Sequence, residues 1–204
     1  YKSIAETFDK QNGGFGKAPK FPMVTTLEFL LVYHFHTKNK EALFIVESTI
    51  LKMIRGGIYD QLAGGFSRYS TDEKWLVPHF EKMLYDNAGL LSIMVQVFQI
   101  TKNQEIESAI IQTIEFLKNE MQINSFGFAA SIDADSDSAE GQFYVWEINE
   151  LEQVLGNDSK YLVEYFGITE EGNYEGKNVL SREKEADTFQ TLNHLPIGFL
   201  EKAI

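Results

Sequence analysis

Two pairs of helical segments, each an apolar helix followed by an amphipathic one, constrain the fold of this chain most strongly. Residues 25–38 and 81–102 are apolar around most of their circumference, whereas residues 40–55 and 104–120 carry a single apolar stripe. A helix that is apolar all round is usually buried, and a helix with one stripe lies on a surface. Buried and surface helices therefore alternate along the chain. This alternation predicts an all-α fold, a partial toroid of helix hairpins with an inner and an outer ring.

The connections between these helices are of two kinds. Each inner helix is joined to its outer helix by a short polar turn, at residues 36–40 and 101–103. The outer helices are followed instead by long segments, residues 56–78 and 122–147. Structureless connections of that length are uncommon inside compact domains and tend to carry function. We therefore expect the long loops on one rim of the toroid, with a functional site among them.

The second half of the chain contains a segment that resembles a β-strand. Residues 142–146 predict a short strand, which we expect to pair with residues 126–131 as a small β-hairpin in the long loop. The pattern weakens beyond residue 158. Residues 167–187 are polar and predict an extended loop, and a last helix is expected after Pro196.

Composition excludes several classes of protein. The net charge of −12 argues against nucleic-acid binding, because an acidic surface repels phosphates. No apolar run reaches membrane-spanning length, and the absence of cysteine rules out disulfides and thiol nucleophiles. We expect a cytoplasmic protein without metal or cofactor. The chain starts at Tyr1 and stops within an apolar-periodic run, so we interpret residues 1–204 as a piece of a longer protein.

The segment before the second inner helix is the richest in side chains that can carry chemistry. His79, Lys82 and Asp86 are spaced i, i+3 and i+7, which places them on one stripe of a helix. The polar stripe occupies the helix end nearest the long loops, where a toroid opens into a pocket. Because His79 follows Pro78, we expect it in the first helical turn, where the helix dipole disfavours a positive charge on its ring. The alternative is a helix cap with a local polar network.

Proton transfer next to a carbonyl group needs an acid and a base in one pocket. His79 is the predicted base, with Asp86, Glu81 or an Asp from a neighbouring loop orienting its ring. The predicted substrate-binding residues of this segment are Asp60, Arg68, Trp75, Lys82 and Tyr85.

An acidic run in the third long segment supplies the other candidates. Asp133, Asp135 and Asp137 imitate the start of an EF-hand loop, but the required Gly and Glu at its sixth and twelfth positions are missing. A looser cation site is the alternative that this run leaves open. The simpler interpretation is that Asp133 and Asp135 face the pocket beside Tyr144 and Trp146, since sugars bind to carboxylates and aromatic faces.

Four stretches together resemble the YyaL / spermatogenesis-associated thioredoxin-domain family. They are GGFGKAPKFP (13–22), GGIYDQLAGGFSRYSTDEKWLVPHFEKMLYDNAGLL (56–91), ASIDADSDSAEGQFYVW (130–146) and EGKNVL (175–180). The resemblance implies an N-terminal thioredoxin-like domain followed by an (α/α)6 toroid similar to N-acylglucosamine 2-epimerases and six-hairpin glycosidases. Residues 1–204 would then be about the first half of the toroid, without the thioredoxin-like domain.

Three functions are compatible with these residues. The leading hypothesis is a sugar epimerase or isomerase that uses His79. A glycosidase-like hydrolase would instead pair Asp60 or Asp86 with Asp133 or Asp135, at about 5–5.5 Å for retention or 6.5–9.5 Å for inversion. The third is a non-catalytic scaffold that binds a ligand or a partner and serves the thioredoxin-like domain. Half a toroid also leaves inner helices uncovered, which favours self-association of the isolated chain.

Overall fold

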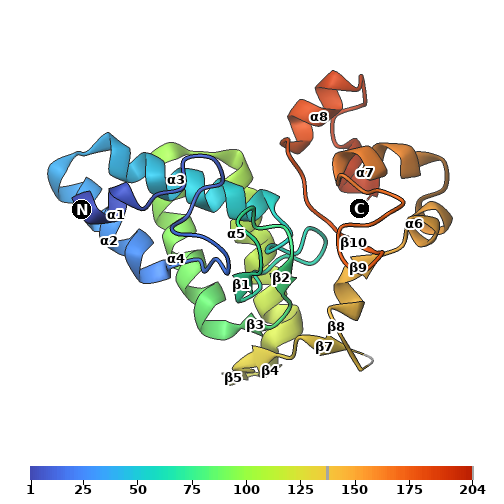
Figure 1. Cartoon of the computed structure of the whole chain (residues 1–204), viewed down its shortest axis with the longest axis horizontal. Coiled ribbons are helices and arrows are strands. Elements are labelled where there is room, and N and C mark those ends of the chain that lie inside the picture. Colours follow the sequence, from blue (N-terminus) through green and yellow to red (C-terminus); the bar gives the residue numbers. More distant parts are fainter. Residues whose placement is uncertain (137, 204) are drawn as a thin grey trace.

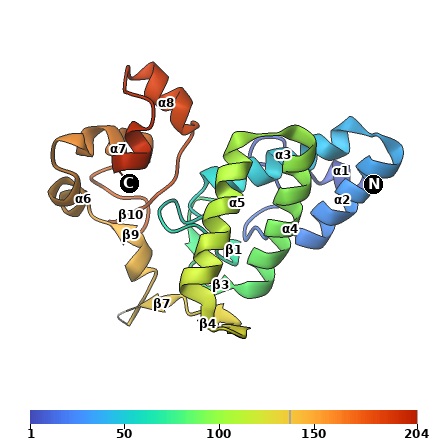
Figure 2. The same ribbon diagram turned by 180° about the vertical axis from the view of Figure 1, so that it is seen from behind.

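The computed structural model describes residues 1–136 and 138–203, and these form two lobes (Figure 1). The larger lobe contains the paired helices of the N-terminal part of the chain, and the smaller lobe contains the C-terminal part, coloured orange to red. Figure 2 shows the same division from behind. None of the described helices is both long and apolar enough to cross a membrane.

The larger lobe consists of two antiparallel helix hairpins that pack side by side. The first hairpin is α2 (Val24–Thr37) with α3 (Lys40–Arg55), and the second is α4 (Leu84–Thr101) with α5 (Gln104–Phe116). Helix α2 packs against α4, and α3 packs against α5. A short helix, α1 (Lys2–Glu6), precedes them. The helix hairpins predicted from the periodicity are therefore confirmed. Their shared core includes Leu27, Leu30, Ile50, Met53, Leu90 and Met94.

The same three residues, Thr-Lys-Asn, join the two helices of each hairpin. Lys38 and Lys102 end their helices in the left-handed conformation, with φ of 58° and 59°. The carboxamide oxygen of Asn39 accepts a hydrogen bond from the backbone N–H of Ala42 at 2.9 Å, and Asn103 caps α5 in the same way. The short turns therefore contain their own stop and start signals for the helices.

The long loops meet at the opposite end of the hairpins. The loop before α2 pairs with the loop before α4, because the backbone N–H groups of Lys20 and Ser70 each donate to the other residue's carbonyl. Helix α5 continues into a single π-helical turn, Leu117–Met121. The third long segment begins there. The three long segments therefore contact one another, through Lys20 and Ser70 and through the pairing of Lys82–Met83 with Ser131–Ile132.

The strands are short antiparallel pairs within these loops. They are β1 (Tyr69–Ser70) with β2 (Pro78–His79), β3 (Lys82–Met83) with β6 (Ser131–Ile132), β4 (Gln122–Asn124) with β5 (Gly127–Phe128), β7 (Asp135–Ser136) with β8 (Ala139–Glu140), and β9 (Val145–Trp146) with β10 (Asn178–Val179). The predicted pairing of residues 142–146 with 126–131 is wrong. The strand at Val145–Trp146 forms, but its partner comes from the smaller lobe, and a hairpin forms within residues 122–128.

The second inner helix begins at Leu84, three residues later than predicted. Lys82 and Met83 pair with the strand at residues 131–132, and the N–H of Leu84 donates to the carbonyl of Ala130 at 2.9 Å. Strand pairing therefore continues up to the first residue of α4. The residues from His79 to Met83 are extended rather than helical, and the expectation that His79 lies in the first helical turn is wrong.

The smaller lobe has its own core. It contains α6 (Ile148–Leu155), α7 (Ser159–Tyr165), α8 (Ala186–Leu192) and α9 (Phe199–Ala203), which bury Leu151, Leu162, Phe166, Ile168, Phe189 and Leu200. The last helix, expected after Pro196, is confirmed. The short helices α6, α7 and α8 were not predicted, because each has only seven or eight residues and leaves too few positions for a clear period.

A buried carboxylate joins the two lobes. Glu105, at the start of α5, has a side chain only 6% exposed, and it binds two guanidinium groups. Arg55, at the end of α3, approaches it at 2.6 Å, and Arg182 of the smaller lobe approaches it at 2.5 Å. Charge-assisted hydrogen bonds of this kind are stronger than neutral ones. The smaller lobe is thereby fixed to the last residue of α3 and the first turn of α5.

Candidate functional site

An extended segment, residues 79–82, separates two groups of predicted site residues. Successive side chains of an extended chain point to opposite faces. Phe80 and Lys82 are buried and line a pocket between the lobes, whereas His79 and Glu81 are partly exposed and approach each other at 3.9 Å. The prediction that His79 and Lys82 share one stripe is therefore wrong, because the stripe requires a helix.

His79 is held by a residue that the sequence interpretation did not select. Its Nδ1 lies 2.7 Å from Oε1 of Glu140, and the same oxygen accepts the backbone N–H of Phe80 at 3.3 Å. The ring of Tyr69 stacks on the imidazole, with 5.1 Å between centroids. Contacts from a carboxylate and an aromatic ring thus fix the orientation of His79.

Arg68 and Asp86 complete this group. Arg68 binds the carboxylate of Glu81 at 2.9 Å. Asp86 lies in the first turn of α4, and among the described residues its buried Oδ2 has no hydrogen-bond partner. Burial raises the pKa of Asp86 to about 6, with Glu81 adding to the increase and Arg68 opposing it. We call Arg68, His79, Glu81, Asp86 and Glu140 the histidine cluster.

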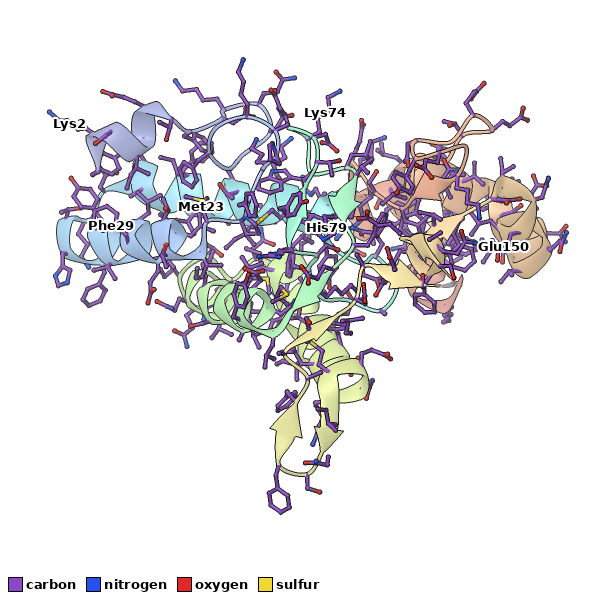
Figure 3. All side chains as sticks on the ribbon, turned by 60° about the horizontal axis from the view of Figure 1, so that its bottom comes forward. Lys2, Met23, Phe29, Lys74, His79 and Glu150 are labelled. Carbon is purple, nitrogen blue, oxygen red and sulfur yellow. The ribbon has the colours of Figure 1, made fainter. Side chains whose placement is uncertain are left out.

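The histidine cluster lies at the loop end of an exposed helical wall. Helices α2 and α4 expose apolar side chains, such as Val32 at 51% and Tyr85 at 58%, as expected for uncovered inner helices. In Figure 3, His79 lies near the junction of the lobes, whereas Phe29, on α2, lies in the larger lobe away from that junction. The predicted substrate-binding residue Tyr85 directly precedes Asp86, and its exposed side chain lies at the edge of the histidine cluster.

The other face of residues 79–82 borders a cavity of about 470 Å³ between the lobes, which we call the interlobe pocket. Four predicted substrate-binding residues line it: Asp60, Lys82, Tyr144 and Trp146. The ammonium group of Lys82 lies 2.9 Å from Oδ2 of Asp60 and donates to the carbonyl of Gly64 at 3.2 Å. Burial lowers the pKa of Lys82, and the charge of Asp60 opposes that change. The pair is therefore part of the pocket wall.

Aromatic rings surround the buried ammonium group. The Nζ atom of Lys82 lies 4.5 Å from the ring centroid of Phe116 and 4.7 Å from that of Tyr144. Such contacts favour the charged form of a lysine. The ring of Tyr144 also stacks on Phe80 at 5.7 Å, and burial raises the pKa of its phenol to about 12. Tyr144 therefore remains protonated and can donate a hydrogen bond into the pocket.

Trp75, a predicted substrate-binding residue, lies in the core. Its side chain has no exposed surface, and its Nε1 donates to the carbonyl of Asn12 at 2.9 Å. Its indole lies against Gly14, where an added Cβ would approach Cζ2 at 2.5 Å. The structure thus places Trp75 away from both candidate sites and makes it a packing residue.

Asp133 and Asp135 of the acidic run are not among the described residues that line the interlobe pocket, where the sequence analysis expected them beside Tyr144 and Trp146. Asp133 and Asp135 are both exposed, and Asp137 lies outside the described residues. Asp135 pairs across β7 and β8 with Glu140, which is the residue that reaches His79. The acidic run was the available signal for Glu140, but sequence spacing alone did not distinguish this carboxylate from its neighbours.

Comparison with known proteins identifies relatives. No protein-family model matches the chain. Human spermatogenesis-associated protein 20 is 34% identical over 211 residues, covering 89% of this chain and 27% of the relative. Its mouse counterpart is 34% identical over 193 residues, covering 85% of this chain and 24% of the relative. This chain belongs to the spermatogenesis-associated protein 20 family. It spans about a quarter of the length of these curated relatives.

Solved structures resemble this segment of the spermatogenesis-associated protein 20 family in fold. A sugar epimerase from a ruminal bacterium aligns with a TM-score of 0.56 at 14% identity, over 78% of this chain and 46% of the epimerase. Cellobiose 2-epimerase from Bacillus thermoamylovorans aligns with a TM-score of 0.55 at 15% identity, over 74% and 45%. The likeness confirms the predicted fold, part of an (α/α)6 toroid. At such identities it is a likeness of fold alone.

Proposed function

We propose that the histidine cluster is the acid–base centre of a sugar epimerase- or isomerase-like enzyme. The observation that carries the proposal is an imidazole clamped by Glu140 in the same cluster as Asp86, a carboxyl with a pKa of about 6. Histidine is the side chain best suited to exchange protons near neutral pH. The structural resemblance to sugar epimerases supports the substrate class.

The roles follow from the chemistry of each group. Epimerisation next to a carbonyl removes a proton from carbon and returns it to the opposite face. His79 takes the proton, and Glu140 stabilises the imidazolium that forms. Arg68 stabilises the negative charge that develops on the carbonyl oxygen. Asp86, protonated in part near neutral pH, supplies a proton in the return step.

Two observations weigh against the hydrolase alternative. Oδ1 of Asp60 already accepts the N–H groups of Leu62 and Ala63 at 3.0 Å each, and its Oδ2 binds Lys82. A carboxylate with these partners is poorly placed to act as a nucleophile. Asp133 is exposed, and its Oδ1 accepts the backbone N–H of Asp135. Asp60 and Asp133 therefore have little support as members of a catalytic carboxylate pair.

Hydrogen exchange at carbon tests the proposal without knowledge of the product. The full-length protein is incubated in D2O with cellobiose, glucose or mannose, and NMR follows loss of the proton next to the carbonyl carbon. We expect exchange with the natural protein and none with His79→Gln, because an amide binds hydroxyls but takes no proton. His36→Gln is the matched control, since His36 is exposed at the far end of α2.

Two results would reject the proposed function. Full exchange activity in His79→Gln would show that His79 is not the base. Binding of a sugar to the natural protein without any exchange at carbon would favour the non-catalytic scaffold instead.

A further inference from the structure

We propose that the interlobe pocket is a second binding site, separate from the histidine cluster, for an uncharged ring that bears hydroxyl groups. The pocket lies on the opposite face of residues 79–82, so a ligand inside it meets Phe80 and Lys82 rather than His79. A volume of about 470 Å³ is within the range of small-molecule sites. The proposal goes beyond the proposed function, because it does not depend on His79 being catalytic.

Both lobes build the pocket, and ionic contacts fix their positions. Glu105 binds Arg55 and Arg182 across the junction, and Nε of Arg182 donates to Oε1 of Gln61, which lines the pocket, at 3.0 Å. Gln61 is itself buried and donates to the carbonyl of Gly56 at 2.9 Å. The pocket is therefore preformed, as most small-molecule sites are.

Aromatic side chains provide the walls for a ring. Tyr144 and Trp146 line the pocket together with Phe143, which is 73% exposed. Phe143 meets Tyr144 edge to face at 5.2 Å, so adjacent rings present differently oriented surfaces. The exposed ring of Phe143 and the partly buried rings of Tyr144 and Trp146 together give the pocket an aromatic lining. Flat apolar walls of this kind stack against a ring rather than an extended chain.

The charges that line the pocket favour a neutral ligand. Lys82 is already paired with Asp60, and Lys177 lies 3.7 Å from Glu147 and donates to Gln142 at 3.2 Å. The remaining charged lining residue, Glu150, is exposed and repels anions. A cation gains little, because screening by water weakens its attraction to an exposed carboxylate.

Two hydroxyl groups are available for hydrogen bonding. Within the part of the chain that the structure describes, neither Oγ of Ser67 nor the phenol oxygen of Tyr144 forms a hydrogen bond with protein. Ser67 is buried, with an exposure of 4%. Neither oxygen is among the fully buried, unpaired atoms of the described residues, so water can reach both. A ligand that displaces this water needs hydrogen-bonding groups of its own. Hydroxyl groups meet this need, because each can both donate and accept.

A reporter inside the pocket tests the inference. The full-length protein is labelled with 5-fluorotryptophan, and the resonance of Trp146 is assigned by its loss in Trp146→Phe. Glucose and cellobiose are the uncharged probes, and glucuronate and glucosamine are the anionic and cationic counterparts of glucose. We expect glucose or cellobiose to shift the Trp146 resonance saturably, at lower concentration than either charged probe.

Variants separate the pocket from the histidine cluster. Ala63 is exposed at the pocket wall, so Ala63→Phe fills the space and should weaken binding about tenfold or more. Leu192→Phe, an exposed position on α8, is the matched control and should bind like the natural protein. His79→Gln should also retain the saturable shift, because its side chain lies outside the pocket.

Any of four results would overturn the inference. They are no saturable shift with either uncharged probe, an unchanged affinity in Ala63→Phe, loss of the shift in His79→Gln, and tighter binding of glucuronate or glucosamine than of glucose. The proposed function fails separately, through the exchange experiment on His79.

Discussion

The imidazole of His79 and the carboxylate of Glu140 lie 2.7 Å apart although they are 61 residues apart in the chain. His79 belongs to the loop before α4, and Glu140 belongs to the loop after α5. The candidate site therefore requires both long loops. The partner of His79 is a side chain that local helix geometry would not supply.

Removing the charge at residue 140 should impair catalysis more than stability. In Glu140→Gln the imidazolium loses its counter-charge, so we expect carbon–hydrogen exchange to slow by about 10²-fold. The exchange assay in D2O measures this rate. Asp135→Asn is the matched control, because Asp135 is exposed and lies opposite Glu140 in the strand pair. An equal effect of both substitutions would mean that only the net charge of the loop matters.

Asp86 should make stability depend on pH. Its pKa is raised to about 6 by burial, above the ordinary value of about 3.9 in an unfolded chain. The folded state thus holds the proton more tightly, so this contribution to stability is complete below about pH 4 and is lost as pH rises through about 6. Asp86→Asn should stabilise the protein at pH 8, by on the order of 1 kcal/mol after solvent screening, and not at pH 4.

Thermal unfolding at the two pH values measures this difference. Asp133→Asn provides the comparison, since Asp133 is an exposed carboxylate. A gain in unfolding temperature that is the same at pH 4 and pH 8 for Asp86→Asn would contradict the assigned shift.

Removing only one member of the buried Lys82–Asp60 ion pair should lower the free energy of unfolding substantially. Lys82→Met leaves the carboxylate of Asp60 without its counter-charge in a largely buried place, with an expected loss of about 3–5 kcal/mol. Adding Asp60→Asn removes the unpaired charge and should recover part of that loss. Urea denaturation of both variants measures the difference. A double variant less stable than Lys82→Met would show that Asp60 acts chiefly through the turn it caps.

Two glycines with the same backbone conformation should respond differently to alanine. Gly14 and Gly16 have φ of 73° and 72°, so both substitutions incur left-handed strain of about 1–2 kcal/mol. At Gly14 the added Cβ would also meet Cζ2 of Trp75 at 2.5 Å, whereas at Gly16 nothing lies within 4 Å. We expect Gly14→Ala to be the more destabilising in thermal unfolding. Equal effects would mean that the indole of Trp75 shifts freely.

The sequence predicted the helix hairpins because their signals are local. The apolar stripe of residues 40–55 and the capping side chains of Asn39 and Asn103 lie within the elements that they define. The predicted site residues separate into different places in the structure. Arg68, His79, Glu81 and Asp86 do gather in one cluster, while Trp75 packs in the core because its indole fills the space beside Gly14.

By itself the sequence determined the family, the helix hairpins and the loops that carry the candidate residues. The tertiary structure decided which of those residues face one another. Residues 79–82 were compatible with a helix, in which His79 and Lys82 share a face. Pairing of Pro78–His79 with Tyr69–Ser70, and of Lys82–Met83 with Ser131–Ile132, holds them extended instead. In an extended chain alternate side chains point to opposite faces, so His79 joins Glu140 and Lys82 joins Asp60. That choice depends on hydrogen bonds to a distant segment, which the local periodicity does not contain.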